Sequence, residues 1–122
     1  MIELKIGIAG FGVVGKRRKE CVDRHPHLRV VAVFDQFFDG EGILEEGVNY
    51  FQDYSRLLNE ELDVLIVCLT NDIAAEVTIA GLELNLHVFC EKPPGRNVED
   101  IVRVIEHEKK LPHLKLMYGF NH

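Results

Sequence analysis

The chain has 122 residues, 47% hydrophobic and 28% charged, which suits one folded domain and argues against wholesale disorder. Its net charge of −6 disfavours nucleic acid as a partner, because a phosphate backbone repels an acidic surface. The chain has no apolar run of about 18 residues, so no membrane span is predicted. The first residues lack a signal-peptide pattern, and we therefore expect a cytoplasmic protein. Cys21, Cys68 and Cys90 match no disulfide or metal motif, so no metal is expected.

Strands and helices are expected to alternate along the chain. In order, they are strand 4–9, helix from about 16 to before Pro26, strand 30–34, irregular acidic stretch 39–46, strand 48–51, helix 54–59, strand 64–69, helix after 70–72, strand 86–90, helix after Asn97 and strand 114–118. The run 64–69 is apolar without alternation, as in a strand buried on both faces. In the helix after 72, one apolar face is expected from the spacing of Ile73, Val77, Ala80 and Leu84.

This alternation predicts an α/β fold over residues 1–122, with a doubly wound parallel sheet between helices on both faces. The segment Gly10-Phe11-Gly12-Val13-Val14-Gly15 has the pattern G-x-G-x-x-G. Alone that pattern is weak, but here it follows a predicted strand and opens a predicted helix, and Asp35 lies 20 residues after Gly15. Together these features are typical of a dinucleotide-binding Rossmann fold, of three α/β/α layers.

Each part of the pattern has a physical role. Gly10 would allow the tight turn, Gly12 the approach of a diphosphate to bare backbone, and Gly15 close helix packing. Asp35, followed by Gln36, would accept hydrogen bonds from the adenosine ribose and repel a 2′-phosphate, which favours NAD over NADP. The alternatives are a glycine-rich turn without a ligand and an aspartate that only caps a strand end.

Polar residues follow two further strands, at Thr70-Asn71 and at Glu91-Lys92-Pro93. In an open α/β sheet the ligand binds at the carboxyl ends of the strands. From the residues alone, Lys92 fits a functional lysine and a solvent-exposed lysine before a turn equally well.

Glu91-Lys92-Pro93 after the fifth strand, with the glycine pattern and the ending 118–122, resembles the glucose–fructose oxidoreductase/inositol dehydrogenase/rhizopine catabolism family (Gfo/Idh/MocA). The resemblance implies an NAD(P)-dependent oxidoreductase acting on a sugar, cyclitol or nucleotide-linked sugar, and a homo-oligomer. It implies that Lys92 binds the reacting hydroxyl beside the nicotinamide, Glu91 contacts the nearby ribose, and Thr70 and Asn71 line the dinucleotide centre. It also brings Asn121 and His122 towards the active site.

Family members carry a second, larger domain that supplies further substrate contacts, and nothing in 1–122 corresponds to it. We therefore expect a cofactor-binding half that binds NAD without turnover. Two alternatives stay open: a stand-alone module that senses NAD(H), and another oxidoreductase of this fold, such as a dihydrodipicolinate- or biliverdin-reductase relative.

Overall fold

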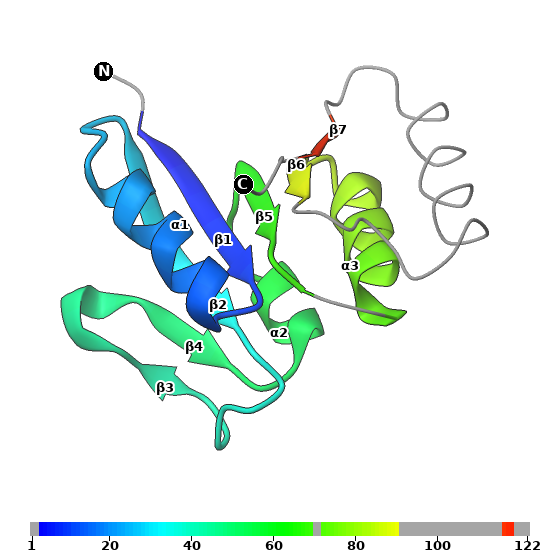
Figure 1. The fold of residues 1–122 in the computed structure, drawn as a ribbon, viewed down its shortest axis with the longest axis horizontal. Helices are drawn as coiled ribbons and strands as arrows, with labels where there is room; N and C mark the ends of the chain where they lie inside the picture. Colours follow the sequence, from blue (N-terminus) through cyan, green and yellow to red (C-terminus); the bar gives the residue numbers. More distant parts are fainter. Residues whose placement is uncertain (1–2, 70–71, 91–115, 119–122) are drawn as a thin grey trace.

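The computed structural model describes residues 3–69, 72–90 and 116–118 (Figure 1). Its strands are β1 Leu4–Ala9, β2 Leu28–Phe34, β3 Gly42–Ile43, β4 Asn49–Phe51, β5 Val64–Val67, β6 His87–Cys90 and β7 Leu116–Tyr118. Its helices are α1 Val13–Asp23, α2 Tyr54–Leu58 and α3 Asp72–Glu83, with a 3₁₀ turn η1 at Glu45–Gly47. None of these helices combines the length and apolarity needed to cross a bilayer.

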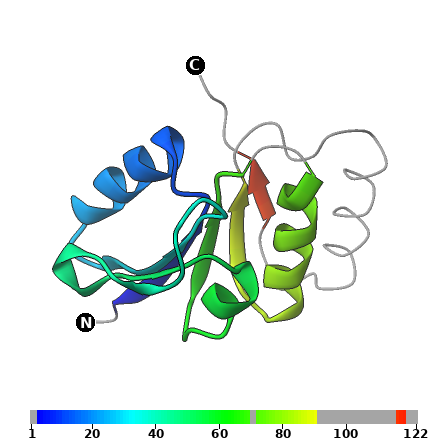
Figure 2. The same cartoon turned by 90° about the horizontal axis from the view of Figure 1, so that it is seen from below.

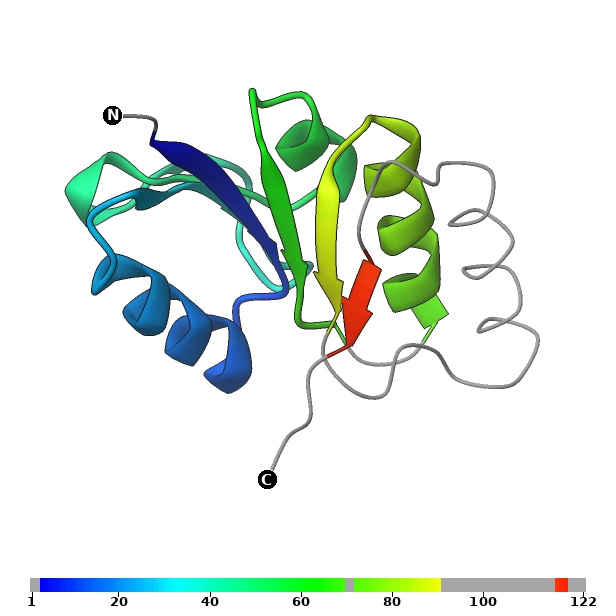
Figure 3. The same cartoon turned by 90° about the horizontal axis from the view of Figure 1, so that it is seen from above.

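The strands form one sheet in the order β3-β4-β2-β1-β5-β6-β7. All neighbouring pairs are parallel except β3 and β4. The order runs outward in opposite directions from β1, and Figure 3 shows β1, β5, β6 and β7 side by side with their carboxyl ends at one edge. The reversal between β1 and β5 is the switch point where such sheets bind ligands.

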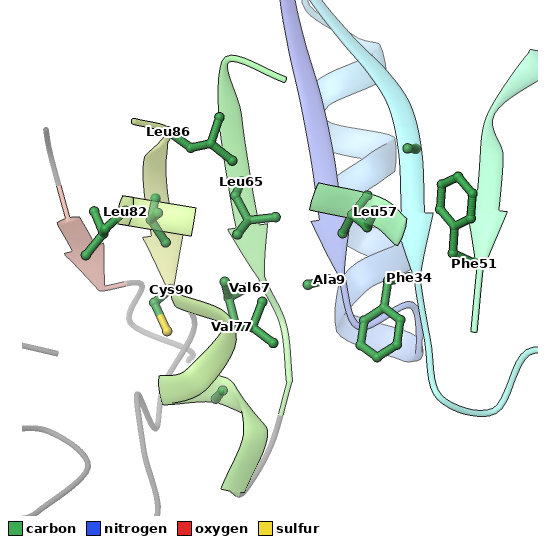
Figure 4. Packing of buried hydrophobic residues seen from close by; sticks show 13 residues of the cluster. Ala9, Phe34, Phe51, Leu57, Leu65, Val67, Val77, Leu82, Leu86 and Cys90 are labelled. Atoms are coloured by element: carbon green, nitrogen blue, oxygen red, sulfur yellow. The ribbon is translucent and has the colours of Figure 1, made fainter. Parts of the chain in front are cut away.

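Two hydrophobic clusters lie on the two faces of the sheet, because alternate residues of a strand point to opposite faces. Ile6 and Ile8 of β1 pack with Val22 of α1 on one face. Ala9 of β1 packs with Leu57 of α2 and residues of α3 on the other (Figures 2 and 4). The predicted doubly wound sheet with helices on both faces is confirmed.

Several predicted boundaries shift. Helix α1 begins at Val13, about three residues earlier than expected, and ends at Asp23, before Pro26 as expected, whereas β5 ends at Val67 rather than at residue 69. The predicted apolar face of α3 is wrong in part, because Leu84 lies beyond the helix end and is 52% exposed. The buried residues of this helix are instead Ala74, Ala75, Val77, Thr78, Ile79, Gly81 and Leu82. The helix is apolar around most of its surface, so spacing alone did not identify its buried side.

The connection from β2 to β4 contains no α-helix, although all of its residues, 35–48, are described. The stretch expected to be irregular holds the short strand β3, which pairs antiparallel with β4. Phe38, Leu44 and Tyr50 pack against the cluster on the α1 face. The ring centroids of Phe38 and Tyr50 lie 4.9 Å apart, and the ring centroids of Phe38 and Phe11 lie 6.2 Å apart. We call Phe11, Phe38 and Tyr50 the aromatic cluster; it occupies the face that a crossover helix usually covers.

Candidate functional site

The turn between β1 and α1 requires glycine at two positions. Gly10 has a φ of +98°, which disfavours any residue with a side chain, and a Cβ there would lie 2.6 Å from the carbonyl oxygen of Cys68. A Cβ on Gly15 would collide with the carbonyl oxygen of Gly10. These two glycines therefore allow the chain to turn tightly and the helix to begin directly against the turn.

Gly12 is different, because a Cβ there would meet no described heavy atom within 4 Å. Gly12 is also the N-cap residue of α1, which has no side-chain hydrogen bond at its cap and no acidic residue in its first turn. The first N–H groups of a helix have no acceptor within the helix, and they carry a partial positive charge. The loop thus presents bare, electropositive backbone to open space, which fits a bound diphosphate.

Asp35 connects this loop to the next strand end. One carboxylate oxygen, Oδ2, accepts a hydrogen bond of 2.8 Å from the Phe11 N–H, and Oδ1 accepts one of 2.9 Å from the Phe37 N–H. The Asp35 N–H itself donates to the Phe51 carbonyl of β4 at 3.1 Å. Each carboxylate oxygen can accept a further hydrogen bond, so the group can hold a ribose hydroxyl while it fixes the loop.

The loop and the strand ends enclose a groove of about 290 Å³. Its lining residues are Gly10, Gly12, Val13, Val14, Asp35, Gln36, Phe37, Cys68, Leu69 and Ile73. We call this the strand-end groove; it combines one carboxylate and a helix N-terminus with apolar walls. That mixture suits a ligand with anionic, hydroxyl-bearing and flat apolar parts.

A second hollow, of about 430 Å³, adjoins the strand-end groove and shares Gln36 and Ile73 with it. Gln52, Asp53 and Tyr54 add polar groups to its wall. Burial raises the pKa of the Tyr54 hydroxyl, and the negative charge of Glu76 and a hydrogen bond with it act in the same direction. The tyrosine therefore stays protonated and neutral at physiological pH.

The structure brings most of the residues predicted from the first half of the chain to one place. Gly10, Gly12, Val13, Val14, Asp35 and Gln36 line the strand-end groove. Phe11 and Gly15 do not line it: the Phe11 ring packs in the aromatic cluster, and Gly15 is buried. Both support the turn, Phe11 through its N–H and Gly15 through its lack of a side chain.

The remaining predicted residues, Thr70, Asn71, Glu91, Lys92, Asn121 and His122, lie outside the described residues. Four residues that line the groove were not predicted from the sequence as site residues: Phe37, Cys68, Leu69 and Ile73. Cys68 and Leu69 come directly after β5, at the switch point, but the predicted strand 64–69 included them; Phe37 follows the end of β2 by three residues. The Cζ atom of Arg18 lies 5.6 Å from the ring centroid of Phe89 on β6, so the guanidinium packs over the sheet.

The fold and the site together define a dinucleotide-binding domain of the Rossmann type. Residues 4–120 match the model of the oxidoreductase family with an NAD-binding Rossmann fold, Gfo/Idh/MocA. The chain belongs to this family, and NAD is its cofactor.

Several of the curated relatives are named inositol dehydrogenases. An inositol 2-dehydrogenase of Salmonella typhimurium is 32% identical over 96% of this chain and 37% of its own length. A myo-inositol 2-dehydrogenase of Thermotoga maritima is 30% identical over 97% of this chain and 36% of its own length. The chain thus spans little more than a third of the length of the relatives that it matches.

The fold also agrees with a solved structure, scyllo-inositol dehydrogenase from Lactobacillus casei with bound NAD(H) and scyllo-inositol. It superposes with a TM-score of 0.83 at 22% identity, over 96% of this chain and 36% of that one. Membership of the oxidoreductase family removes the support for a stand-alone sensor module, and it favours the sugar-type family over other reductases of this fold.

Proposed function

We propose that this chain is the cofactor-binding part of an enzyme that moves a hydride between NAD and a hydroxyl of a sugar, cyclitol or nucleotide-linked sugar. The observation that carries the proposal is the open backbone at Gly12 beside the Asp35 carboxylate, in one groove at the switch point. When bound, the nicotinamide ring supplies the hydride acceptor or donor. Inositol dehydrogenases among the relatives support a cyclitol as the substrate class.

The chain's own groups would divide the work of binding. The first N–H groups of α1 would hold the diphosphate, because they are unpaired within the helix and electropositive. Asp35 would accept from the ribose hydroxyls and disfavour a 2′-phosphate by charge repulsion, so NAD is preferred over NADP. Gln36 adds a neutral side chain at the same edge.

The catalytic part of the proposal comes from sequence. Lys92, as the neutral amine, would accept a hydrogen bond from the reacting hydroxyl and take up its proton as the hydride leaves, with Glu91 at the nearby ribose. Thr70 and Asn71 would line the dinucleotide between its two halves. Residues that correspond to the rest of the relatives' length would complete the substrate pocket, so we propose that residues 1–122 bind NAD and turn nothing over. A cytoplasmic location and a homo-oligomer stay predictions.

Calorimetric titration of the 122-residue chain with NAD and NADP tests the binding function. We expect NAD to bind more tightly, and no binding of either would overturn the proposal. The activity is tested in a protein that contains this chain and a segment corresponding to the rest of its relatives' length. The assay measures oxidation of a panel of cyclitols and sugars. There Lys92→Ala should lower turnover far more than NAD affinity, whereas Lys5→Ala, near the amino-terminal end of the central strand β1, should change neither. An equal loss of turnover and NAD affinity would make Lys92 a cofactor ligand only.

A further inference from the structure

Phe37 is the most exposed large hydrophobic residue in the described part of the chain, at 85% of its surface. Isolated exposed hydrophobic side chains are common and need no explanation. Phe37, however, is held in place: its N–H donates to Asp35 Oδ1 at 2.9 Å, and its side chain contributes to the wall of the strand-end groove. The hydrogen bond thus fixes the backbone of Phe37, which carries an aromatic ring at the strand-end groove.

We infer that Phe37 is the platform on which the adenine ring of the dinucleotide stacks. The inference rests on the proposed function and names the residue that would recognise the base. A flat aromatic ring attracts a nucleobase through stacking and exclusion of water, largely independently of hydrogen-bond pattern. Leu69 and Ile73 line the same groove and offer further apolar surface to the base.

The order of groups along the groove supports this assignment. The Asp35 carboxylate receives the Phe11 N–H of the phosphate-binding turn on one oxygen and the Phe37 N–H on the other, at 2.8 and 2.9 Å. The carboxylate therefore lies between the turn and Phe37. Adenosine diphosphate has the same order of parts, with the ribose between the diphosphate and the base.

The neighbouring phenylalanine does not serve this role. Phe38 packs against Tyr50 with ring centroids 4.9 Å apart, and it belongs to the aromatic cluster. Of the two consecutive rings, one stabilises the fold and the other is available to a ligand. The adjoining hollow, which shares Gln36 and Ile73 with the groove, offers Gln52 and Asp53 as polar partners for the edge of the base.

The test compares Phe37→Ala with Ile43→Ala, a matched control because Ile43 on β3 is 70% exposed and lines neither hollow. Alanine keeps the backbone N–H that binds Asp35, so the carboxylate stays in place. We expect Phe37→Ala to weaken calorimetric binding of both NAD and ADP-ribose by about tenfold or more, the size of one base–aromatic stack. Ile43→Ala should bind both like the unmodified chain, and Phe37→Tyr should bind within about twofold of it.

A fluorescence experiment supplies a second readout, because the chain contains no tryptophan. In Phe37→Trp the new indole is the only one, and stacking of adenine should quench its emission. ADP-ribose should quench it and ribose 5-phosphate should not. If the unmodified chain binds NAD while Phe37→Ala binds it equally well, the inference is wrong and the proposed function stands. If the unmodified chain does not bind NAD, the proposed function itself is wrong.

Discussion

The three glycines of the β1–α1 turn should respond differently to the same substitution. Gly12→Ala adds a methyl group where no described atom lies within 4 Å. Gly10→Ala adds one at a φ of +98° and 2.6 Å from the Cys68 carbonyl oxygen, and Gly15→Ala adds one against the Gly10 carbonyl oxygen. We therefore expect Gly12→Ala to lose the ligand and keep the fold, and the other two to lose stability.

The magnitudes follow from the geometry. Gly12 has φ −81° and ψ −151°, which alanine tolerates; alanine is a poorer N-cap, but it also restricts the unfolded chain. These terms oppose each other, so the free energy of unfolding should change by less than about 1 kcal/mol. At Gly10 and Gly15, strain and collision should cost at least about 2 kcal/mol. A methyl group on Gly12 that displaces the diphosphate from two N–H groups would cost about 3–6 kcal/mol, a loss of NAD affinity of at least about a hundredfold.

Urea denaturation and calorimetric titration with NAD, measured on the same preparations, separate the two effects. Retention of NAD affinity within about threefold by Gly12→Ala would refute the idea that a diphosphate passes over this residue. A loss of more than about 2 kcal/mol of stability in Gly12→Ala would refute the openness of the turn itself. Either result would be clear, because the other two variants show what a packed glycine costs in the same turn.

Three further predictions concern neighbouring groups. Asp35→Ala should weaken NAD binding and reduce the difference between the affinities for NAD and NADP in calorimetric titration, because the carboxylate that repels a 2′-phosphate is removed. An unchanged ratio of the two affinities would contradict this role of Asp35. Phe38→Ala should lower the free energy of unfolding in urea by about 1–3 kcal/mol, because it removes the ring between Phe11 and Tyr50; a loss below about 0.5 kcal/mol would contradict this. Hydrogen bonds from the Ser55 N–H and hydroxyl lower the pKa of Asp53, so its stabilisation is fully present above its unfolded pKa of about 4 and is lost as the pH falls through the lowered pKa of the folded state. The melting temperature of Asp53→Ala should lie below that of the unmodified chain at pH 7, and the difference should shrink in acid; a difference of unchanged size at pH 2 would exclude this cause.

The sequence predicted the features of this site that depend on backbone rules. Three spaced glycines after an apolar strand have few structural solutions, and a carboxylate at the end of the next parallel strand must lie at the same edge of the sheet. The uninterrupted apolar run that begins at Val64 placed β5 in the middle of the sheet, as observed. Such rules are local, or they follow from the parallel topology, and they do not require knowledge of individual side-chain contacts.

What the sequence did not predict depends on tertiary contacts. The two residues of β3 are too few for a period, and they form a strand because they pair with β4 and because Gly42 leaves room for the Tyr50 ring. Phe37 and Phe38 are identical in type and adjacent, yet one is exposed at the groove and the other packs in the aromatic cluster. Only the path of the loop after β2 distinguishes them.

The contacts around the groove predict a link between cofactor binding and stability in this domain. Asp35 satisfies backbone N–H groups on two segments, and the same carboxylate is proposed to hold the ribose. The Phe11 ring beside the first of those segments packs against Phe38, and Phe38 packs against Tyr50 of β4. A change in the β3–β4 hairpin therefore reaches the phosphate-binding turn through two rings and one carboxylate.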